Sequence, residues 1–189
     1  MAKRASTSGD QLTGGTKDVN PQFLSGRVTM TAANTAITVP LGTPIVRVGP
    51  QTSGQAIIME VLKVWVQMPN IDTDAAAATS RVFQASFRTV ASTTAPGALD
   101  DPRCFAFFER TVRNAFTAAG TGMLDYQNDP LCFDCTDGAG HGILIATDNV
   151  FITVLTSGQT AAEAFPFKIL YRFKKVSLIE YIGIVQSQQ

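Results

Sequence analysis

The chain has 189 residues, which suits one domain with a terminal arm. Charged residues make up 16% of the chain, against about 25% in ordinary soluble domains, and a surface so poor in charge is typical of a protein covered by neighbouring subunits. Because the formal net charge is zero, we exclude a protein that binds nucleic acid through overall positive charge, so any such contact must come from local basic patches.

Residues 1–26 are rich in Ser, Thr, Gly, Asp and Gln, and we predict that they form an extended, slightly basic arm containing Lys3, Arg4 and Lys17. The first residues lack an apolar core, so we expect no secretory signal. No apolar run approaches the roughly 18 residues of a membrane helix, so we expect no membrane insertion. Three cysteines, an odd number, fit a reducing compartment better than a disulfide framework.

Short extended segments separated by turn residues follow the arm. In 56–68, Leu62, Val64 and Val66 alternate with Lys63, Trp65 and Gln67, which indicates a strand with two different faces. The strands predicted in this half are 27–31, 36–41, 45–48, 56–68 and 81–90.

Residues 104–119 show helix-like spacing, since Phe105, Phe108, Val112 and Phe116 recur at three- and four-residue intervals. We therefore predict a helix there, with a strand as the alternative that the aromatic residues would also suit. Three long loops, 71–80, 91–103 and 157–163, are candidates for the outer surface or for contacts between subunits.

The last third has the clearest β pattern. Short extended segments are predicted at 131–135, 142–146 and 150–155, and aromatic and aliphatic residues then alternate from Phe165 to Phe173. The alternation resumes over 176–185, so we expect the chain to end soon after a strand rather than in a helix. Eight or more short strands with few helices predict an all-β sandwich or jelly roll, with residues 1–26 as the arm and 27–189 as the folded domain.

Three sequence blocks resemble the capsid proteins of small circular single-stranded DNA viruses that encode a replication initiator. They are YRFKKVSLIEYIGIVQSQQ (171–189), DGAGHGILIATDNVFITVL (137–155) and EVLKVWVQMP (60–69). The resemblance implies a single eight-stranded jelly-roll sandwich with short helical insertions, many copies of which close an icosahedral shell around circular DNA. The small subunit is consistent with the simplest (T=1) shell. The chain departs from the family in lacking a long Arg-rich arm.

The cysteines and the single histidine are candidates for zinc. Cys104, Cys132, Cys135 and His141 could form a Cys₃His site, but Cys132 and Cys135 lie an odd number of residues apart and would face opposite sides of a straight strand. We therefore favour three buried thiols that act as small apolar groups, with His141 in a structural turn.

Clustered carboxylates are candidates for calcium between subunits, and among them we select Asp134 and Asp137. Solvated loop carboxylates are the favoured interpretation, because no cluster matches a complete calcium loop. With one histidine and no G-x-S-x-G motif, we predict no enzymatic activity and no cofactor, a structural calcium being the alternative.

Basic residues supply the predicted nucleic-acid contacts. Lys168, Arg172 and Lys174 share one face of a predicted strand, and we expect Lys175 to add to this patch. The arm residues Lys3, Arg4 and Lys17 are equally good candidates. Such contacts would reach phosphates without reading bases, and a solvated face is the alternative for the strand residues.

The sequence therefore predicts a structural coat protein of the virion, made in the cytoplasm or nucleus of a host cell. Its partners would be identical subunits and, through non-specific phosphate contacts, a viral genome, with circular single-stranded DNA favoured. No host receptor is predicted. Two alternatives remain open: a coat protein of a small RNA virus with the same fold, and a cellular jelly-roll binding module of the lectin or adhesin type.

Overall fold

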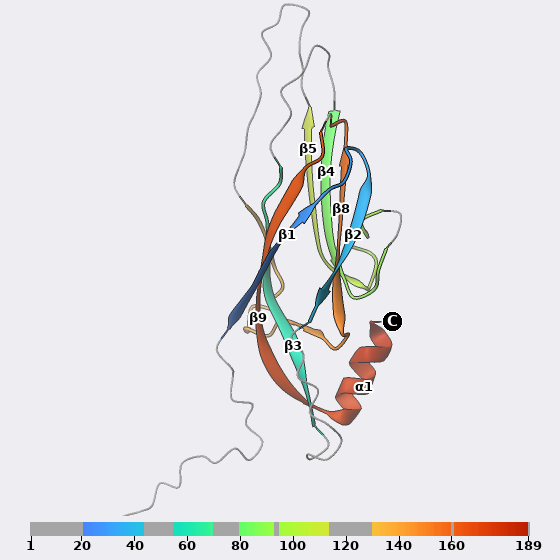
Figure 1. Cartoon of the computed structure of the whole chain (residues 1–189). Coiled ribbons are helices and arrows are strands. Elements are labelled where there is room, and N and C mark those ends of the chain that lie inside the picture. The colour runs from blue at the N-terminus through green and yellow to red at the C-terminus, as the bar shows by residue number, and fades with distance from the viewer. Residues whose placement is uncertain are drawn as a thin grey trace, which may run out of the picture.

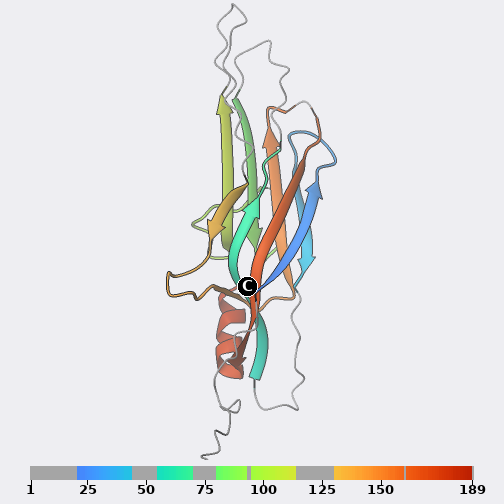
Figure 2. The same cartoon turned by 90° about the vertical axis from the view of Figure 1, so that its left-hand side faces the viewer.

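A computed structural model describes residues 21–43, 55–69, 80–92, 95–113, 130–159 and 161–188. These residues form two antiparallel sheets whose strands run along the long axis of the molecule (Figures 1 and 2). The strands are β1 (Gln22–Thr29), β2 (Ala36–Gly42), β3 (Gln55–Val66), β4 (Ser80–Arg88), β5 (Cys104–Arg113), β6 (Leu131–Asp134), β7 (Ile143–Ile145), β8 (Asn149–Ser157) and β9 (Ala164–Ser177), followed by one helix, α1 (Leu178–Ser187).

The order of the strands is that of a jelly roll. One sheet runs β1-β9-β3-β6, with β7 also paired to β3, and the other runs β2-β8-β4-β5. Strands β6 and β7 pair with successive parts of β3, at 63–66 and 59–61, so they are two pieces of one interrupted strand. Counted this way, the described chain has eight strands in two sheets of four, and the predicted fold class is confirmed.

The core lies between the sheets and is filled from both sides. Phe87 of β4 is fully buried and contacts the rings of Phe105, Phe108 and Phe167, with centroids 6.0 to 6.1 Å apart in tilted and edge-to-face arrangements. Such aromatic pairs add about 0.5–1.5 kcal/mol each beyond the area that they bury. The predicted alternation in β9 is confirmed, because Phe165, Phe167, Ile169 and Tyr171 are all buried in this core.

The prediction of a helix at 104–119 is wrong where the structure describes it, since Cys104–Arg113 is strand β5. The reason is a β-bulge: Phe87 pairs with Ala106 but Arg88 pairs with Cys104, so Phe105 is an extra residue. A bulge reverses the alternation of faces. Phe105 and Phe108 therefore both reach the core although they lie three residues apart, which imitates helical spacing.

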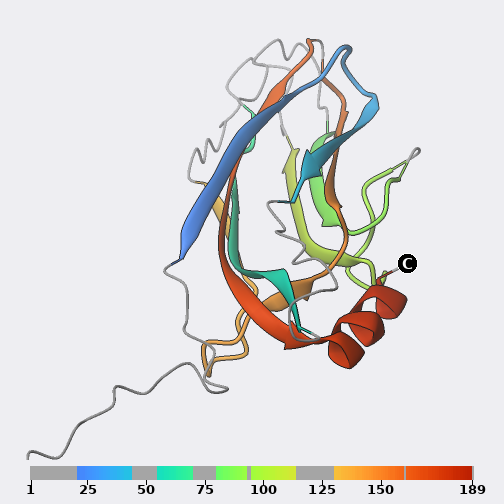
Figure 3. The ribbon, with the colours of Figure 1, turned by 60° about the horizontal axis from the view of Figure 1, so that its bottom comes forward.

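The prediction of an extended segment at 176–185, and of a chain that does not end in a helix, is also wrong. Helix α1 begins after Ser177, whose hydroxyl accepts a hydrogen bond from the backbone N–H of Glu180 at 3.2 Å. It lies beside the ends of β3 and β9 (Figure 3), where Tyr181, Ile184 and Val185 pack on a small second core. None of the helices among the described residues has the length and apolar character to cross a bilayer.

One strand begins earlier than predicted, and three predicted segments lie outside the residues that the structure describes. Strand β1 begins at Gln22, inside the segment assigned to the arm, because residues 22–26 pair with β9. The arm residues 1–20, the predicted strand at 45–48 and the rest of the predicted helix beyond 113 lie outside the described residues.

A bulge in β3 explains why the sixth of the eight strands is split into β6 and β7. The register of β3 against β9 shifts between Val61 and Lys63, which leaves Leu62 as the extra residue. The Leu62 carbonyl accepts a hydrogen bond from the Cys135 backbone N–H at 2.9 Å, and the chain then leaves the sheet until β7. Where the chain rejoins the sheet before β7, Gly142 packs closely on the bulge. A Cβ at this position would lie 2.1 Å from the Val61 carbonyl oxygen.

We expect Gly142→Ala to lower the free energy of unfolding by about 2 kcal/mol, because the new methyl group must push β7 away from β3. Urea denaturation of the purified chain measures this. Gly42→Ala is the matched control, since a Cβ at Gly42 meets nothing within 4 Å, and it should leave the midpoint almost unchanged. Equal effects of the two substitutions would contradict the assigned close contact.

Candidate functional site

The β1-β9-β3-β6 sheet has an outer face that points away from the core. This face carries more basic than acidic side chains. Its strands place five basic and two acidic side chains on this face. They are Arg27, Lys63, Lys168, Arg172 and Lys174, against Glu60 and Asp134. Since the whole chain has no net charge, this face is a local basic patch.

A fully buried carboxylate lies at the middle of this face. Glu60 is 0% exposed and contacts Arg172 Nε and, at 3.7 Å, Lys174 Nζ, while the Gly142 N–H donates to its Oε1 at 2.9 Å. Burial acts to raise the pKa of Glu60, but the hydrogen bonds from Arg172 and Gly142 and the nearby positive charges outweigh it and lower the pKa. Glu60 is therefore ionised at neutral pH and balances the charge of Arg172.

The loop between β6 and β7 covers this carboxylate. Arg172 donates from Nη2 to the Gly140 carbonyl at 3.0 Å, which ties the loop to β9. Asp137 accepts hydrogen bonds from the backbone N–H groups of Ala139 and His141, and its Oδ2 lies 3.0 Å from His141 Nδ1. These bonds from His141 lower the pKa of Asp137, and they join His141 to the turn that contains Asp137.

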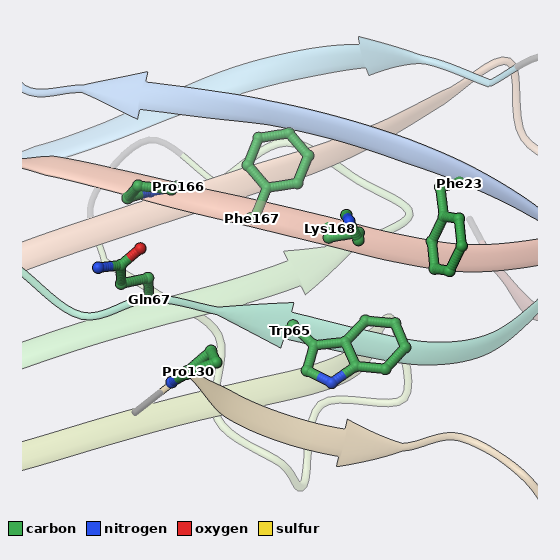
Figure 4. Close-up of a pocket in the computed structure, with 7 residues that line it drawn as sticks. All are labelled: Phe23, Trp65, Gln67, Pro130, Pro166, Phe167 and Lys168. Atoms are coloured by element: carbon green, nitrogen blue, oxygen red, sulfur yellow. The ribbon is translucent and has the colours of Figure 1, made fainter. Parts of the chain in front are cut away.

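An open hollow of about 520 Å³ lies on the same face, farther along β3 and β9 (Figure 4). The Phe23 and Trp65 rings stand 6.2 Å apart at 51°, and Lys168 Nζ lies 4.8 Å from the centre of the Phe23 ring. Phe23 is 59% exposed although it is a large aromatic residue. The residues that line the hollow are Phe23, Trp65, Gln67, Pro130, Pro166, Phe167 and Lys168.

Helix α1 forms a second exposed apolar surface. Its inner side contacts the sheet through Tyr181, Ile184 and Val185, while the adjoining part of its surface presents three large apolar residues to solvent. These are Leu178, Ile179 and Ile182, with exposed fractions of 52%, 86% and 48%. An apolar arc that extends beyond the contact with the sheet is normally covered by another surface.

The predicted basic residues fall into three groups. Lys168, Arg172 and Lys174 share the outer face, but Arg172 and Lys174 are engaged with Glu60. Lys175 directly follows Lys174 in a regular part of the strand, so it points to the other face and does not extend the patch. Lys3, Arg4 and Lys17 lie outside the described residues, and contact of all these residues with nucleic acid stays a prediction.

The cysteines occupy different environments. The expectation of three buried thiols is wrong for Cys132, which is exposed on the outer face of β6, whereas Cys104 and Cys135 are buried. Burial raises the pKa of Cys104, and it raises that of Cys135 to about 12, which disfavours the thiolate that binds zinc.

The two carboxylates selected for calcium are bound within separate turns. The side chain and backbone of Thr136, together with Lys63, lower the pKa of Asp134 to about 2, while Asp137 is bound to His141. Within the described ranges, no group of three or more His, Cys, Asp or Glu side chains is placed to hold a metal ion.

Three features of the structure are not predicted by the sequence analysis: the buried Glu60, the exposed Phe23 and the N-cap of α1. Glu60 was visible as a lone carboxylate in the apolar run AIIMEVLKV, which is a signal for a buried ion pair. Phe23 lies in a polar segment that was assigned to the arm. The cap of α1 was present as Ser177 followed three residues later by Glu180.

The class of protein that this architecture defines is the jelly-roll sandwich, and solved structures share it. VP1 of New Jersey polyomavirus has a TM-score of 0.52 and 7% identity, over 82% of this chain and 100% of that chain. The VP1 pentamer of human polyomavirus 6 has a TM-score of 0.51 and 8% identity, over 82% and 95%. No protein-family profile and no curated protein sequence matches the chain. At such low identity the likeness establishes the fold.

We expect Glu60→Gln to lower the free energy of unfolding by about 3 kcal/mol, because Arg172 and Lys174 lose the buried charge that balances them. A Lys63→Gln control breaks the exposed pair with Asp134 and should leave the denaturation midpoint close to that of the wild type. The pKa of Glu60 is lower in the folded protein than its ordinary value of 4.5. Ionised Glu60 therefore stabilises the fold fully above pH 4.5, and this stabilisation is lost as the pH falls through the pKa of the folded state. The wild-type and Glu60→Gln curves should therefore converge in acid, and a constant difference would contradict the ion pair.

We expect one of the three thiols of the native, unassembled subunit to react rapidly with a thiol reagent. Cys132 is exposed, whereas Cys104 and Cys135 should react only when the protein unfolds. The fast phase should disappear in Cys132→Ser. A fast phase that appears only after addition of a chelator would instead support the zinc hypothesis.

Proposed function

We propose that the chain is a coat subunit that self-assembles into a small icosahedral shell around a viral genome. The observation that carries the proposal is the exposed apolar side of α1, formed by Leu178, Ile179 and Ile182 on a jelly-roll sandwich. Three large aliphatic side chains side by side in water are unfavourable, by about 25 cal/mol per Å² of apolar surface. A second copy of the chain that covers them removes this cost.

The geometry of assembly follows from placing different surfaces in contact. If α1 of one subunit packs on a different surface of the next, the contact is heterologous, and it forms a ring when the rotation between subunits closes. The low charge content of the chain supports several such covered surfaces. The jelly roll is the fold of the VP1 structures described above, which supports a coat role for this chain as well.

The genome that we propose is circular single-stranded DNA, and the simplest shell is the T=1 arrangement. The DNA assignment rests on the sequence blocks at 60–69, 137–155 and 171–189 that resemble capsid proteins of such viruses. The subunit would act without catalysis and would be found in the virion after synthesis in the host cell.

Negative-stain microscopy and sedimentation of the purified full chain test the proposal. We expect uniform closed particles, and nuclease digestion of their contents separates DNA from RNA. A chain that stays monomeric over a wide range of salt and pH would contradict a coat function.

Substitutions on α1 test the interface itself. Ile179→Asp and Ile182→Asp should abolish particles while circular dichroism and thermal melting show a folded subunit, because both side chains are exposed in the isolated subunit. Glu180→Lys is the control, since it changes the charge of the same helix outside the apolar side, and it should still assemble. Particles formed by both aspartate variants would show that α1 is not the contact.

A further inference from the structure

The fold itself does not explain the hollow at Phe23 and Trp65. Phe23 belongs to an edge strand, and its ring is 59% exposed rather than packed in the core. Trp65 points outward from β3, directly opposite Lys168 in the register of β3 and β9. Figure 4 shows the two rings and Lys168 on the same side of the sheet.

We propose that this hollow binds an unpaired base of a single-stranded nucleic acid, with Lys168 on the adjacent phosphate. The inference rests on the proposed coat function, because it names the surface that would meet the genome. An exposed aromatic face stacks on any base, and an ammonium group beside it neutralises the backbone. The exposed amide of Gln67 lies in the same hollow and offers hydrogen bonds to a base edge.

The charge of the surrounding face fits a polyanion. Five basic side chains face outward against two acidic ones, in a chain whose net charge is zero. Glu60 balances Arg172, and Asp134 pairs with Lys63. Among the described residues Lys168 has no carboxylate partner, so its charge is available where the rings stand.

This arrangement predicts how binding should behave. Stacking on a ring needs an unpaired base, so binding should favour single strands over duplexes. Every base can stack, so binding should not depend on the sequence. One lysine makes few phosphate contacts, so binding should depend less on salt than binding by an arginine-rich segment.

Trp65 is the only tryptophan of the chain, so its fluorescence reports on this hollow directly. The full chain is titrated with oligothymidylate and, separately, with heparin as a probe that has charge but no bases. We expect quenching by oligothymidylate and much weaker quenching by heparin at equal charge. Equal quenching by both would overturn the stacking assignment.

Two variants separate stacking from charge. Phe23→Ala should weaken oligothymidylate binding about tenfold, as loss of one stacked ring does elsewhere. Lys168→Ala should flatten the slope of log affinity against log salt by about 0.7, the value for one phosphate of a single strand. Lys175→Ala removes the same charge from the other face and should change neither quantity. Wild-type affinity in both Phe23→Ala and Lys168→Ala would overturn the proposal.

Particle formation is scored for the same variants, so that the two proposals fail separately. Closed particles with unchanged base binding by Phe23→Ala and Lys168→Ala would refute the base site and leave the coat function standing. A wild-type chain that forms no particles but whose Trp65 is quenched by oligothymidylate would refute the coat function and support a single-strand binding surface.

Discussion

The register of β3 against β9, with its bulge at Leu62, is the constraint on which the outer face depends. Glu60 lies opposite Arg172, and Trp65 lies opposite Lys168. Glu60 and Trp65 are five residues apart, so in a regular strand they would point to opposite faces. The bulge reverses the alternation and brings both of them outward, while Val61 and Val64 both remain in the core. The Gly142 contact and the Cys135 hydrogen bond hold the chain in this bulged form.

The sequence allowed the fold class to be predicted, because alternation within single strands is a local property. The run from Phe165 to Tyr171 and the second half of β3 show their faces without reference to a partner. The bulges at Leu62 and Phe105 could not be predicted, since a bulge exists only relative to the neighbouring strand. Phe105 and Phe108 therefore suggested a helix. Helix α1 suggested a strand because its apolar residues cover a wide arc of its surface, which hides the usual amphipathic period.

The pairing of β3 with β9 places three different surfaces in sequence along the outer face of the sheet. Toward one end, Ile58 and Val176 lie under α1. In the middle, Glu60 and the loop that contains Gly140 neutralise and cover Arg172. Toward the other end the sheet is open at Trp65. This arrangement separates an exposed apolar surface, which we propose contacts another copy of the chain, from an aromatic and basic surface, which we propose contacts a polyanion, and one strand register fixes both.

A chain with no net charge can still bind a genome if the attraction is not purely electrostatic. The buried pair of Glu60 and Arg172 removes one cation from the predicted basic patch, and Lys63 is paired with Asp134. What remains at the hollow is one lysine beside two aromatic rings. Phosphate contacts lose strength steeply with salt, whereas stacking depends on apolar contact and persists. Many identical subunits in a shell would multiply a weak site of this kind, since linked weak contacts gain strength through effective concentration. Under the proposed coat function, a modest site in each copy would therefore be enough to hold a single strand against the inside of the shell.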